Sequence, residues 1–319
     1  MRAKAVTSRR GLPDTGTAEP PPSTRRFPDG AAYRVEIPSV EGIRVLEAVV
    51  AAADEHGIVV NRVSQGSGAM LVGESELREM AALGAESGIE VSLFVGPRES
   101  FGVGAHSRSP EGAAHGGQLR GMRGLTYAIE DVVRATEAGI RSFLVADLGL
   151  LVLLRDMQDA GELPLDCGWK VSVAMAPSNP ASIQLLETLG ATTVNVPSDM
   201  TPAELAEMRA ATTLPIDLYI ESPDSLGGVV RENETASLVA AGAPLYAKFG
   251  LRNSQLLYPA GEHLRAQAIS IAREKVARAA VALEWLHRLD PDLSQSLPGA
   301  EGLRVPRPAA DALTSVEAG

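Results

Sequence analysis

The chain has 319 residues, a formal net charge of -11 and a single cysteine, Cys167. One cysteine excludes an internal disulfide, a multi-cysteine zinc site and a four-cysteine iron–sulfur cluster, and it fits a reducing cytoplasm. The acidic balance disfavours nucleic acid and anionic membranes as main partners. No apolar run reaches the roughly 18 residues that a membrane span requires. We therefore expect a cytoplasmic protein that acts on a small molecule.

Both ends of the chain are rich in proline and show no apolar period. Pro20-Pro21-Pro22 lies in the first segment, and Pro298, Pro306 and Pro308 lie in the last. Segments of this composition bury too little apolar surface to fold. We predict a disordered N-terminal tail at 1–29, a disordered C-terminal tail at 291–319, and one domain at 30–290.

Between the tails, short β-rich runs alternate with amphipathic helical segments. The expected strands are 33–37, 58–63, 89–95, 142–146, 170–175, 193–196, 216–220 and 245–249. The expected helices are 43–56, 74–86, 129–137, 150–159, 181–189, 202–211, 233–240 and a longer one at 262–289. This alternation is typical of an α/β protein, either a closed parallel barrel or an open doubly wound sheet.

An internal repeat favours the barrel. Glu76-Leu77-Arg78-Glu79-Met80, before strand three, resembles Glu204-Leu205-Ala206-Glu207-Met208, before strand seven, and Val60-Asn61 matches Val194-Asn195. A repeat shifted by four βα units is a half-barrel, which closes naturally into eight strands. No strand is followed by the glycine-rich dinucleotide motif that would favour an open sheet. We predict a (β/α)8 TIM barrel.

In such a barrel the C-terminal strand ends face the substrate. Asp147 and Glu221 fall at two of these ends. With Glu36 nearby they could hold a divalent cation, Mg²⁺ or Mn²⁺, through oxygen ligands, or they could pair with arginines. Lys248, inside strand eight, could lose its proton on burial and act as a base or Schiff-base lysine, or it could pair with Glu221. Glu221, Lys248 and Asp147 are our catalytic candidates.

Three arginines are expected to converge on the same face: Arg62, Arg98 and Arg252. Their planar guanidinium groups suit a carboxylate or phosphate, although they could instead pair with nearby carboxylates. The other candidates for substrate contact are Asn61, Asn195, Arg231 and Asn253.

The connection at 96–124 is the longest in the barrel, and it carries His106 and His115. Long connections in compact domains are usually functional or mobile, so we predict a lid over the mouth. Trp285, near the end of the last helix, is an expected contact of a homodimer.

From strand five onward the chain resembles the collagenase-like peptidase family. The similar stretches are Val194-Asn195-Val196-Pro197, Glu204-Leu205, Ile220-Glu221 and Gly227-Gly228-Val229-Val230-Arg231. The resemblance spans 58–250 as a pattern, and it implies the barrel fold and a pocket around Glu221 and Arg231. That family carries cysteines after strand seven, and its hydroxylase members hold an iron–sulfur cluster. This chain has Ser222-Pro223-Asp224-Ser225 there, so no iron–sulfur cluster is expected.

Two hypotheses for function follow. The first is an enzyme that acts on a small carboxylate- or phosphate-bearing substrate by lyase or aldolase-type cleavage, or by hydrolysis. The alternative is a ligand-binding or scaffold barrel without catalysis. No Ser-His-Asp or Cys-His arrangement is apparent, which disfavours ordinary peptidase action.

Overall fold

The computed structural model describes residues 2–13, 20–175 and 177–308. Eight parallel strands form a closed barrel in chain order, with the last strand paired to the first. Their bounds are β1 (Tyr33–Pro38), β2 (Arg62–Ser64), β3 (Glu90–Phe94), β4 (Ser142–Val145), β5 (Gly168–Val171), β6 (Thr193–Asn195), β7 (Ile216–Glu221) and β8 (Leu245–Phe249). The predicted (β/α)8 TIM barrel is confirmed.

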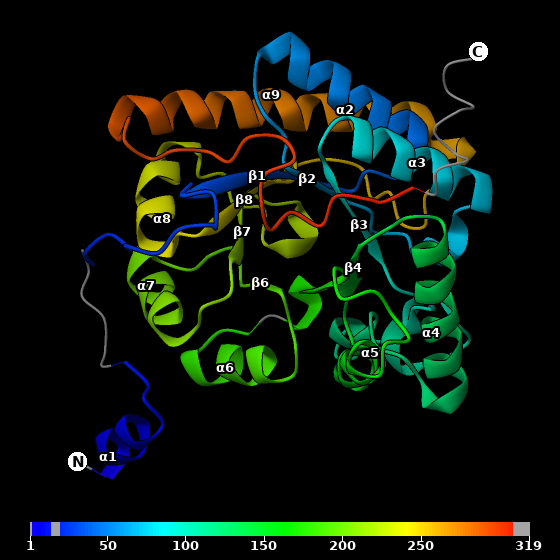
Figure 1. Cartoon of the computed structure of the whole chain (residues 1–319), viewed down its shortest axis with the longest axis horizontal. Helices are drawn as coiled ribbons and strands as arrows, with labels where there is room; N and C mark the ends of the chain where they lie inside the picture. Colours follow the sequence, from blue (N-terminus) through cyan, green and yellow to red (C-terminus); the bar gives the residue numbers. More distant parts are fainter. Residues whose placement is uncertain (1, 14–19, 176, 309–319) are drawn as a thin grey trace.

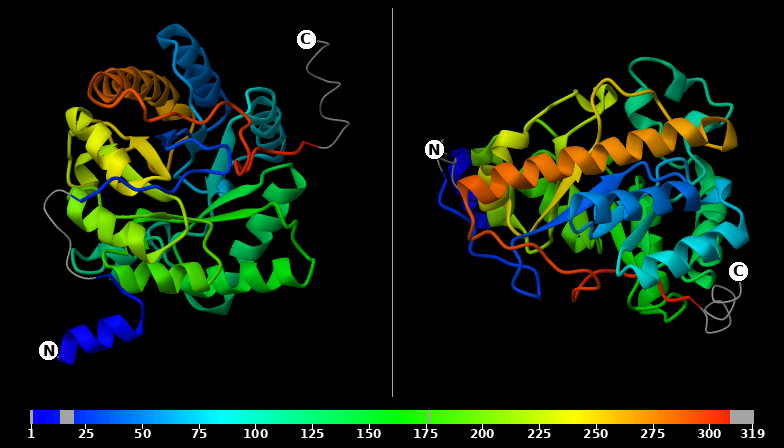
Figure 2. Two further views of the ribbon diagram at one scale, coloured as in Figure 1. Left: turned by 60° about the vertical axis from the view of Figure 1, so that its left-hand side comes forward. Right: turned by 90° about the horizontal axis from the view of Figure 1, so that it is seen from above.

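Helices cover the outside of the barrel (Figure 1). Their bounds are α2 (Ile43–His56), α3 (Glu74–Glu86), α4 (Gly121–Glu137), α5 (Leu148–Asp159), α6 (Pro180–Thr188), α7 (Pro202–Ala211), α8 (Thr235–Gly242) and α9 (Arg265–Leu289). A further short helix, α1 (Arg2–Arg9), lies apart from the barrel. Figure 2 shows the long α9 running alongside α2. Within the described residues, no helix has the length and apolarity to cross a membrane.

Local sequence signals explain where several helices begin. The Thr201 hydroxyl accepts a hydrogen bond from the Glu204 amide, and the Glu204 carboxylate accepts one from the Thr201 amide, which is the predicted capping box of α7. Pro202 occupies the first turn, where its missing N–H is not needed. These caps satisfy amide groups that would otherwise have no partner at a helix start.

The two faces of the barrel wall differ in character. Side chains such as Val35, Ile37 and Leu218 alternate along the strands and are buried against the helices. The residues between them, such as Glu36 and Asp217, are also fully buried, and they point into the barrel. The apolar core therefore lies between barrel and helices, while the centre of the barrel is charged.

The predicted disordered tails are wrong for residues 20–29 and 291–308. Ser294 and Ser296 exchange backbone hydrogen bonds with β1, and the Arg307 amide bonds to the Gly139 carbonyl. Figure 1 shows this segment, in red, crossing one end of the barrel. At the other terminus, Phe27 is buried and the Ser23 amide bonds to Ala240. These proline-rich segments are ordered because their backbone groups pair with the barrel floor. Residues 2–13, also within the predicted N-terminal tail, contain α1 (Arg2–Arg9), and the tail residues 1, 14–19 and 309–319 lie outside the described residues.

The half-barrel repeat holds for the helices but not for the asparagines. Leu77 on α3 and Leu205 on α7 occupy equivalent buried positions, each on the helix before its strand. Asn195 ends β6, whereas Asn61 precedes β2, because β2 begins only at Arg62. The two asparagines therefore lie at opposite ends of the barrel.

Replacing Gly88 with alanine should destabilise the protein more than replacing Gly57. Both glycines have left-handed backbones, with φ of 65° and 64°. A Cβ at Gly57 would meet nothing within 4 Å, whereas one at Gly88 would lie 2.6 Å from the Gly299 amide nitrogen. We expect a loss of about 1–2 kcal/mol for Gly57→Ala and about 1–3 kcal/mol more for Gly88→Ala.

Urea unfolding of the two variants measures this difference. Equal losses would contradict the close packing of the C-terminal segment against α3.

Candidate active site

A charged cluster fills the centre of the barrel, and Glu36 on β1 is its hub. Its carboxylate accepts hydrogen bonds from Arg62 Nε at 2.7 Å, from the Ser64 hydroxyl at 2.7 Å and from Lys170. Lys248 Nζ lies 3.3 Å from the same carboxylate. The pKa of Glu36 lies well below its usual value, because the attraction of Arg62, Lys170 and Lys248 outweighs the effect of burial. We name these residues, together with Glu90 and Asp217, the interior cluster.

Arg62 joins the three carboxylates of the interior cluster. It forms ion pairs with Glu36 and Asp217, and its Nη1 lies 3.6 Å from Glu90. Its guanidinium also stacks 3.4 Å above the centre of the Tyr246 ring. Burial opposes its charge, but the carboxylates of Asp217 and Glu36 hold its pKa well above the usual value. The guanidinium of Arg62 is engaged by these contacts within the protein, so it is not available to bind a substrate at the mouth as predicted.

The two lysines of the interior cluster differ in charge state. Burial, reinforced by repulsion from Arg62, lowers the pKa of Lys170 to about 7. Burial also opposes the charge of Lys248, but attraction by Glu36 raises its pKa above the usual value. Lys248 therefore keeps its proton at neutral pH, whereas burial makes Lys170 easier to deprotonate. Of the two alternatives predicted for Lys248, the contacts favour the ion-paired lysine, with Glu36 rather than Glu221 as its partner.

Lys248 lies on the mouth side of the interior cluster. The strand register pairs it with Tyr219, two residues further along β7 than Asp217. Its Nζ donates to Asn195 Oδ1 at 2.5 Å and lies 4.3 Å from the centre of the Tyr219 ring. Asn195 is fixed in turn, because its Nδ2 donates to the Val171 carbonyl at 2.6 Å. The structure thus brings together Lys248 and Asn195, which were predicted separately as a catalytic and a substrate-contact residue.

Arg98 lies at the mouth, beside the aromatic rings of Phe94 and Tyr258. Its guanidinium stacks 3.7 Å from the Phe94 ring centre and 5.4 Å from that of Tyr258, whose hydroxyl contacts Ser39 at 2.6 Å. One Nη donates to the Gly66 carbonyl, but Nε is buried without a hydrogen-bond partner in the described part of the chain. Burial lowers the pKa of Arg98, with no carboxylate in ion-pair range among the described residues. It is therefore a cation with donor capacity to spare.

The connection after β3 folds over the mouth. It contains three short 3-10 turns, η2 (Glu99–Phe101), η3 (His106–Arg108) and η4 (Ala113–His115), and the rings of His106 and His115 stack 5.6 Å apart. A Cβ on Gly117 would lie 2.9 Å from Ala146, at the end of β4. The segment therefore covers the β3–β5 side of the mouth, and its opening stays a prediction.

Asp147 serves as a structural cap. Its carboxylate accepts hydrogen bonds from the Leu150 amide at 2.9 Å, which caps α5, and from the Leu119 amide at 3.1 Å. Glu221 ends β7, three strands away around the barrel. Across the described residues, no group of three histidine, cysteine or acidic side chains could hold a metal ion. The structure therefore places Asp147 and Glu221 apart, and a divalent cation bound by either of them stays a prediction.

Four other predicted site residues make hydrogen bonds or ion-pair contacts with other residues of the protein. Asn61 is at the floor of the barrel, where Nδ2 donates to the Ser296 carbonyl at 2.9 Å. Arg231 holds the carbonyls of Ser198 and Met200 and pairs with Glu234. Arg252 is largely exposed, 3.8 Å from Asp224, and the Asn253 amide bonds to the same carboxylate. Arg62, Arg98 and Arg252 therefore do not converge.

Glu221 is buried beside a second carboxyl group. Its Oε1 accepts a hydrogen bond from the Arg252 amide at 2.8 Å, and Arg278 on α9 lies 3.9 Å from Oε2. Burial, together with the neighbouring Glu232, raises the pKa of Glu221 to about 7. Glu221 thus titrates near neutral pH, but its contacts among the described residues are with Arg252, Glu232 and Arg278 rather than with the interior cluster.

The sequence did not lead us to Lys170, Asp217 or Tyr219 as site residues. A usable signal was present. Charged residues occur within the strands at Glu36, Arg62, Glu90, Lys170, Asp217 and Lys248. The outer face of each strand packs on apolar helices, which favours an inward direction for these six charges; Glu221, at the end of β7, is an exception that contacts Arg278 on α9.

No model of a known protein family matches the chain, and no curated protein matches its sequence. Among solved structures, a U32 peptidase is 14% identical, with a TM-score of 0.38, over 69% of this chain and 78% of that one. A proposed fructose-1,6-biphosphate aldolase from Coccidioides immitis is 11% identical, with a TM-score of 0.49, over 81% and 93%. YagE from E. coli, of the dihydrodipicolinic acid synthase family, is 13% identical, with a TM-score of 0.42, over 89% and 97%. The likeness is one of fold.

Replacing Glu36 with glutamine should strongly destabilise the protein. The substitution keeps the shape but leaves Arg62, Lys170 and Lys248 with less negative charge beside them. Breaking a buried ion pair by removing one partner costs about 3–5 kcal/mol. Glu47→Gln is the matched control, because Glu47 pairs with Arg44 on the surface and should lose less than about 1 kcal/mol.

Chemical denaturation gives both free energies of unfolding. A Glu36→Gln variant as stable as the Glu47→Gln control would refute the role of Glu36 as hub.

Replacing Glu221 with glutamine should change how stability depends on pH. The folded-state pKa of Glu221 is raised from 4.5 to about 7, so the folded chain holds this proton more tightly than the unfolded chain. Its contribution to stability is complete below pH 4.5 and declines as the pH rises to about 7. Glutamine imitates the protonated acid. The variant should match the wild type at about pH 4 and exceed it by on the order of 2 kcal/mol at about pH 8.

Urea unfolding at several pH values tests this expectation. A variant that is no more stable than the wild type in alkaline solution would show that Glu221 is ionised without penalty.

Proposed function

We propose that this barrel is an enzyme that cleaves or rearranges a small anionic substrate next to a carbonyl group, in the manner of a lyase or aldolase. The observation that supports this most directly is the position of Lys248. Its ammonium group lies on the mouth side of a buried cluster, held by Asn195 and Glu36 beside the Tyr219 ring. A fixed positive charge in a dry site stabilises negative charge that develops on a substrate oxygen.

Arg98 is the proposed anchor for the anionic group of the substrate. It carries a buried Nε that has no partner within the described residues, and it stacks on Phe94 at the mouth. Guanidinium groups bind carboxylate and phosphate through paired N–H donors. A substrate held there would extend past Tyr258 and Tyr219 toward Lys248, because these side chains neighbour one another in that order.

Lys170 is the proposed proton reservoir of the site. Its pKa of about 7 lets it gain and lose a proton under neutral conditions. It contacts Glu36, which also lies beside Lys248. Proton transfer is most effective when the pKa of the group lies near the working pH. Lys248 would stabilise the oxyanion while Lys170 resets the charge of the cluster.

A second candidate function is a ligand-binding barrel without catalysis. It is favoured by the saturation of Glu36, whose two oxygens contact Arg62, Ser64 and both lysines. A cluster in which every charged group is paired could have a purely structural role, as the packed centre of the barrel.

Replacing Lys248 with methionine separates the two candidates. Wild type, Lys248→Met and Lys275→Met would be tested for turnover of a panel of small 2-oxo acids and sugar phosphates. Lys275 is an equally buried lysine on α9, outside the barrel, which donates to the Pro38 carbonyl at 2.7 Å. We expect kcat/KM to fall by about 10²–10³ in Lys248→Met, as for the loss of one oxyanion donor, and to change little in the control.

Full activity of Lys248→Met on a substrate that the wild type converts would refute the proposed role of Lys248. Absence of turnover of any carbonyl substrate, with ligand binding retained, would favour the second candidate. Borohydride reduction during turnover adds a further check, because trapping of substrate on a lysine would show that the reaction proceeds through an imine rather than an oxyanion held by an ammonium group.

A further inference from the structure

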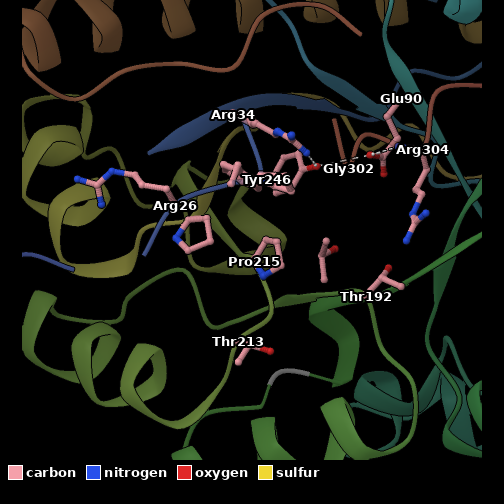
Figure 3. A pocket seen from close by; sticks show the side chains of 13 residues that line it. Arg26, Arg34, Glu90, Thr192, Thr213, Pro215, Tyr246, Gly302 and Arg304 are labelled. Atoms are coloured by element: carbon pink, nitrogen blue, oxygen red, sulfur yellow. Dashed lines mark hydrogen bonds between the residues drawn. The ribbon is translucent and has the colours of Figure 1, made fainter. Parts of the chain in front are cut away.

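A cavity of about 370 Å³ opens at the floor of the barrel, the end opposite the mouth (Figure 3). Its wall combines residues from the strand starts with the two terminal segments that cross the floor, among them Phe27 and Arg304. Cavities that bind small molecules usually have volumes of about 300–1,000 Å³. We name this cavity the floor pocket.

The floor pocket is positively charged. Three arginines line it, Arg26, Arg34 and Arg304, against one acid, Glu90. The carboxylate of Glu90 is already in use, because it accepts hydrogen bonds from the Ser142 hydroxyl at 2.8 Å and from the Arg304 amide at 3.1 Å. The pocket therefore has an excess of positive charge.

Arg304 supplies the free hydrogen-bond donors. Within the described residues, its guanidinium has no hydrogen bond and no ion pair, whereas that of Arg34 is bound to Ser296, Tyr246 and Glu301. Its side chain passes directly over Gly168, where a Cβ would lie 2.9 Å from Arg304 Cγ. Figure 3 shows Arg304 reaching from one side of the pocket toward Thr192.

The lining also includes apolar and aromatic side chains. Phe27 and Tyr246 meet edge to face, with ring centres 5.4 Å apart. Pro28, Pro215 and Pro244 are further apolar residues of the lining. Such surfaces favour a ligand that has a flat or aliphatic body in addition to its charge.

We infer that the floor pocket binds a small organic anion, with its carboxylate on Arg304 and Thr192 and its apolar body against Phe27 and Tyr246. The binding is independent of the reaction proposed for the mouth. Arg304 and Thr192 each present donors that no described residue satisfies, and a carboxylate accepts hydrogen bonds from both.

Titration calorimetry with benzoate as the probe tests this inference on the full chain. Benzoate should bind the wild type, and Arg304→Gln should weaken binding by about tenfold or more. Arg288→Gln is the matched control, because it removes the same charge from an exposed site on α9 and should bind as the wild type does. Thr192→Val, which removes a hydroxyl and keeps the shape, should weaken binding by a smaller factor.

Three results would overturn the inference. The first is no benzoate binding by the wild type at millimolar concentration. The second is equal binding by Arg304→Gln and the wild type. The third is loss of binding in Arg98→Gln with retention in Arg304→Gln, which would place benzoate at the mouth. Inorganic phosphate, which has no apolar body, should bind more weakly than benzoate, and tighter binding of phosphate would refute the part assigned to Phe27 and Tyr246.

Discussion

The burial of Glu36 among three cations is the interaction on which the rest of the structure depends. Desolvating a lone carboxylate at the centre of a barrel costs much free energy, and the same holds for Arg62, Lys170 or Lys248 without a partner. Because β1 pairs with both β2 and β8, the register places Arg62 and Lys248 directly beside Glu36. A slip of one residue would turn these charges toward the apolar helices. The same contacts therefore fix the register of the sheet and position Lys248 beneath the mouth.

Much of the fold could be predicted because helix signals are local. Helices α2, α3 and α7 begin and end where the sequence pattern places them. Strand ends are less certain, because both faces of a parallel strand are buried and apolar alternation is weak. For this reason we predicted Asn61 at the mouth of the barrel, whereas it lies at the floor. The terminal segments were misjudged because composition does not reveal backbone pairing with a distant strand, such as that of Ser296 with β1.

The candidate site was harder to predict than the fold, for a physical reason. Arg62, Arg98 and Arg252 have the same side chain, but their surroundings differ. Arg62 is buried in ion pairs, Arg98 has a donor without a partner in the described part of the chain, and Arg252 is largely exposed. The difference between Lys170 and Lys248 is likewise set by neighbours on other strands. Contacts across the barrel are not encoded in the spacing along one strand. The inward direction of strand charges was predictable, whereas their pairing was not.

The floor of the barrel has a consequence for the order of folding during synthesis. Strand β1 is the first strand to leave the ribosome. Arg34 on this strand can donate its hydrogen bonds to Ser296 and Glu301 only after all eight strands have been synthesised. The Asn61 amide likewise waits for the Ser296 carbonyl. In the nascent chain, polar side chains that are buried in the folded protein therefore stay exposed to water at the floor until the C-terminal segment has been synthesised. Closure of the floor therefore has to follow the synthesis of all eight strands and of the C-terminal segment.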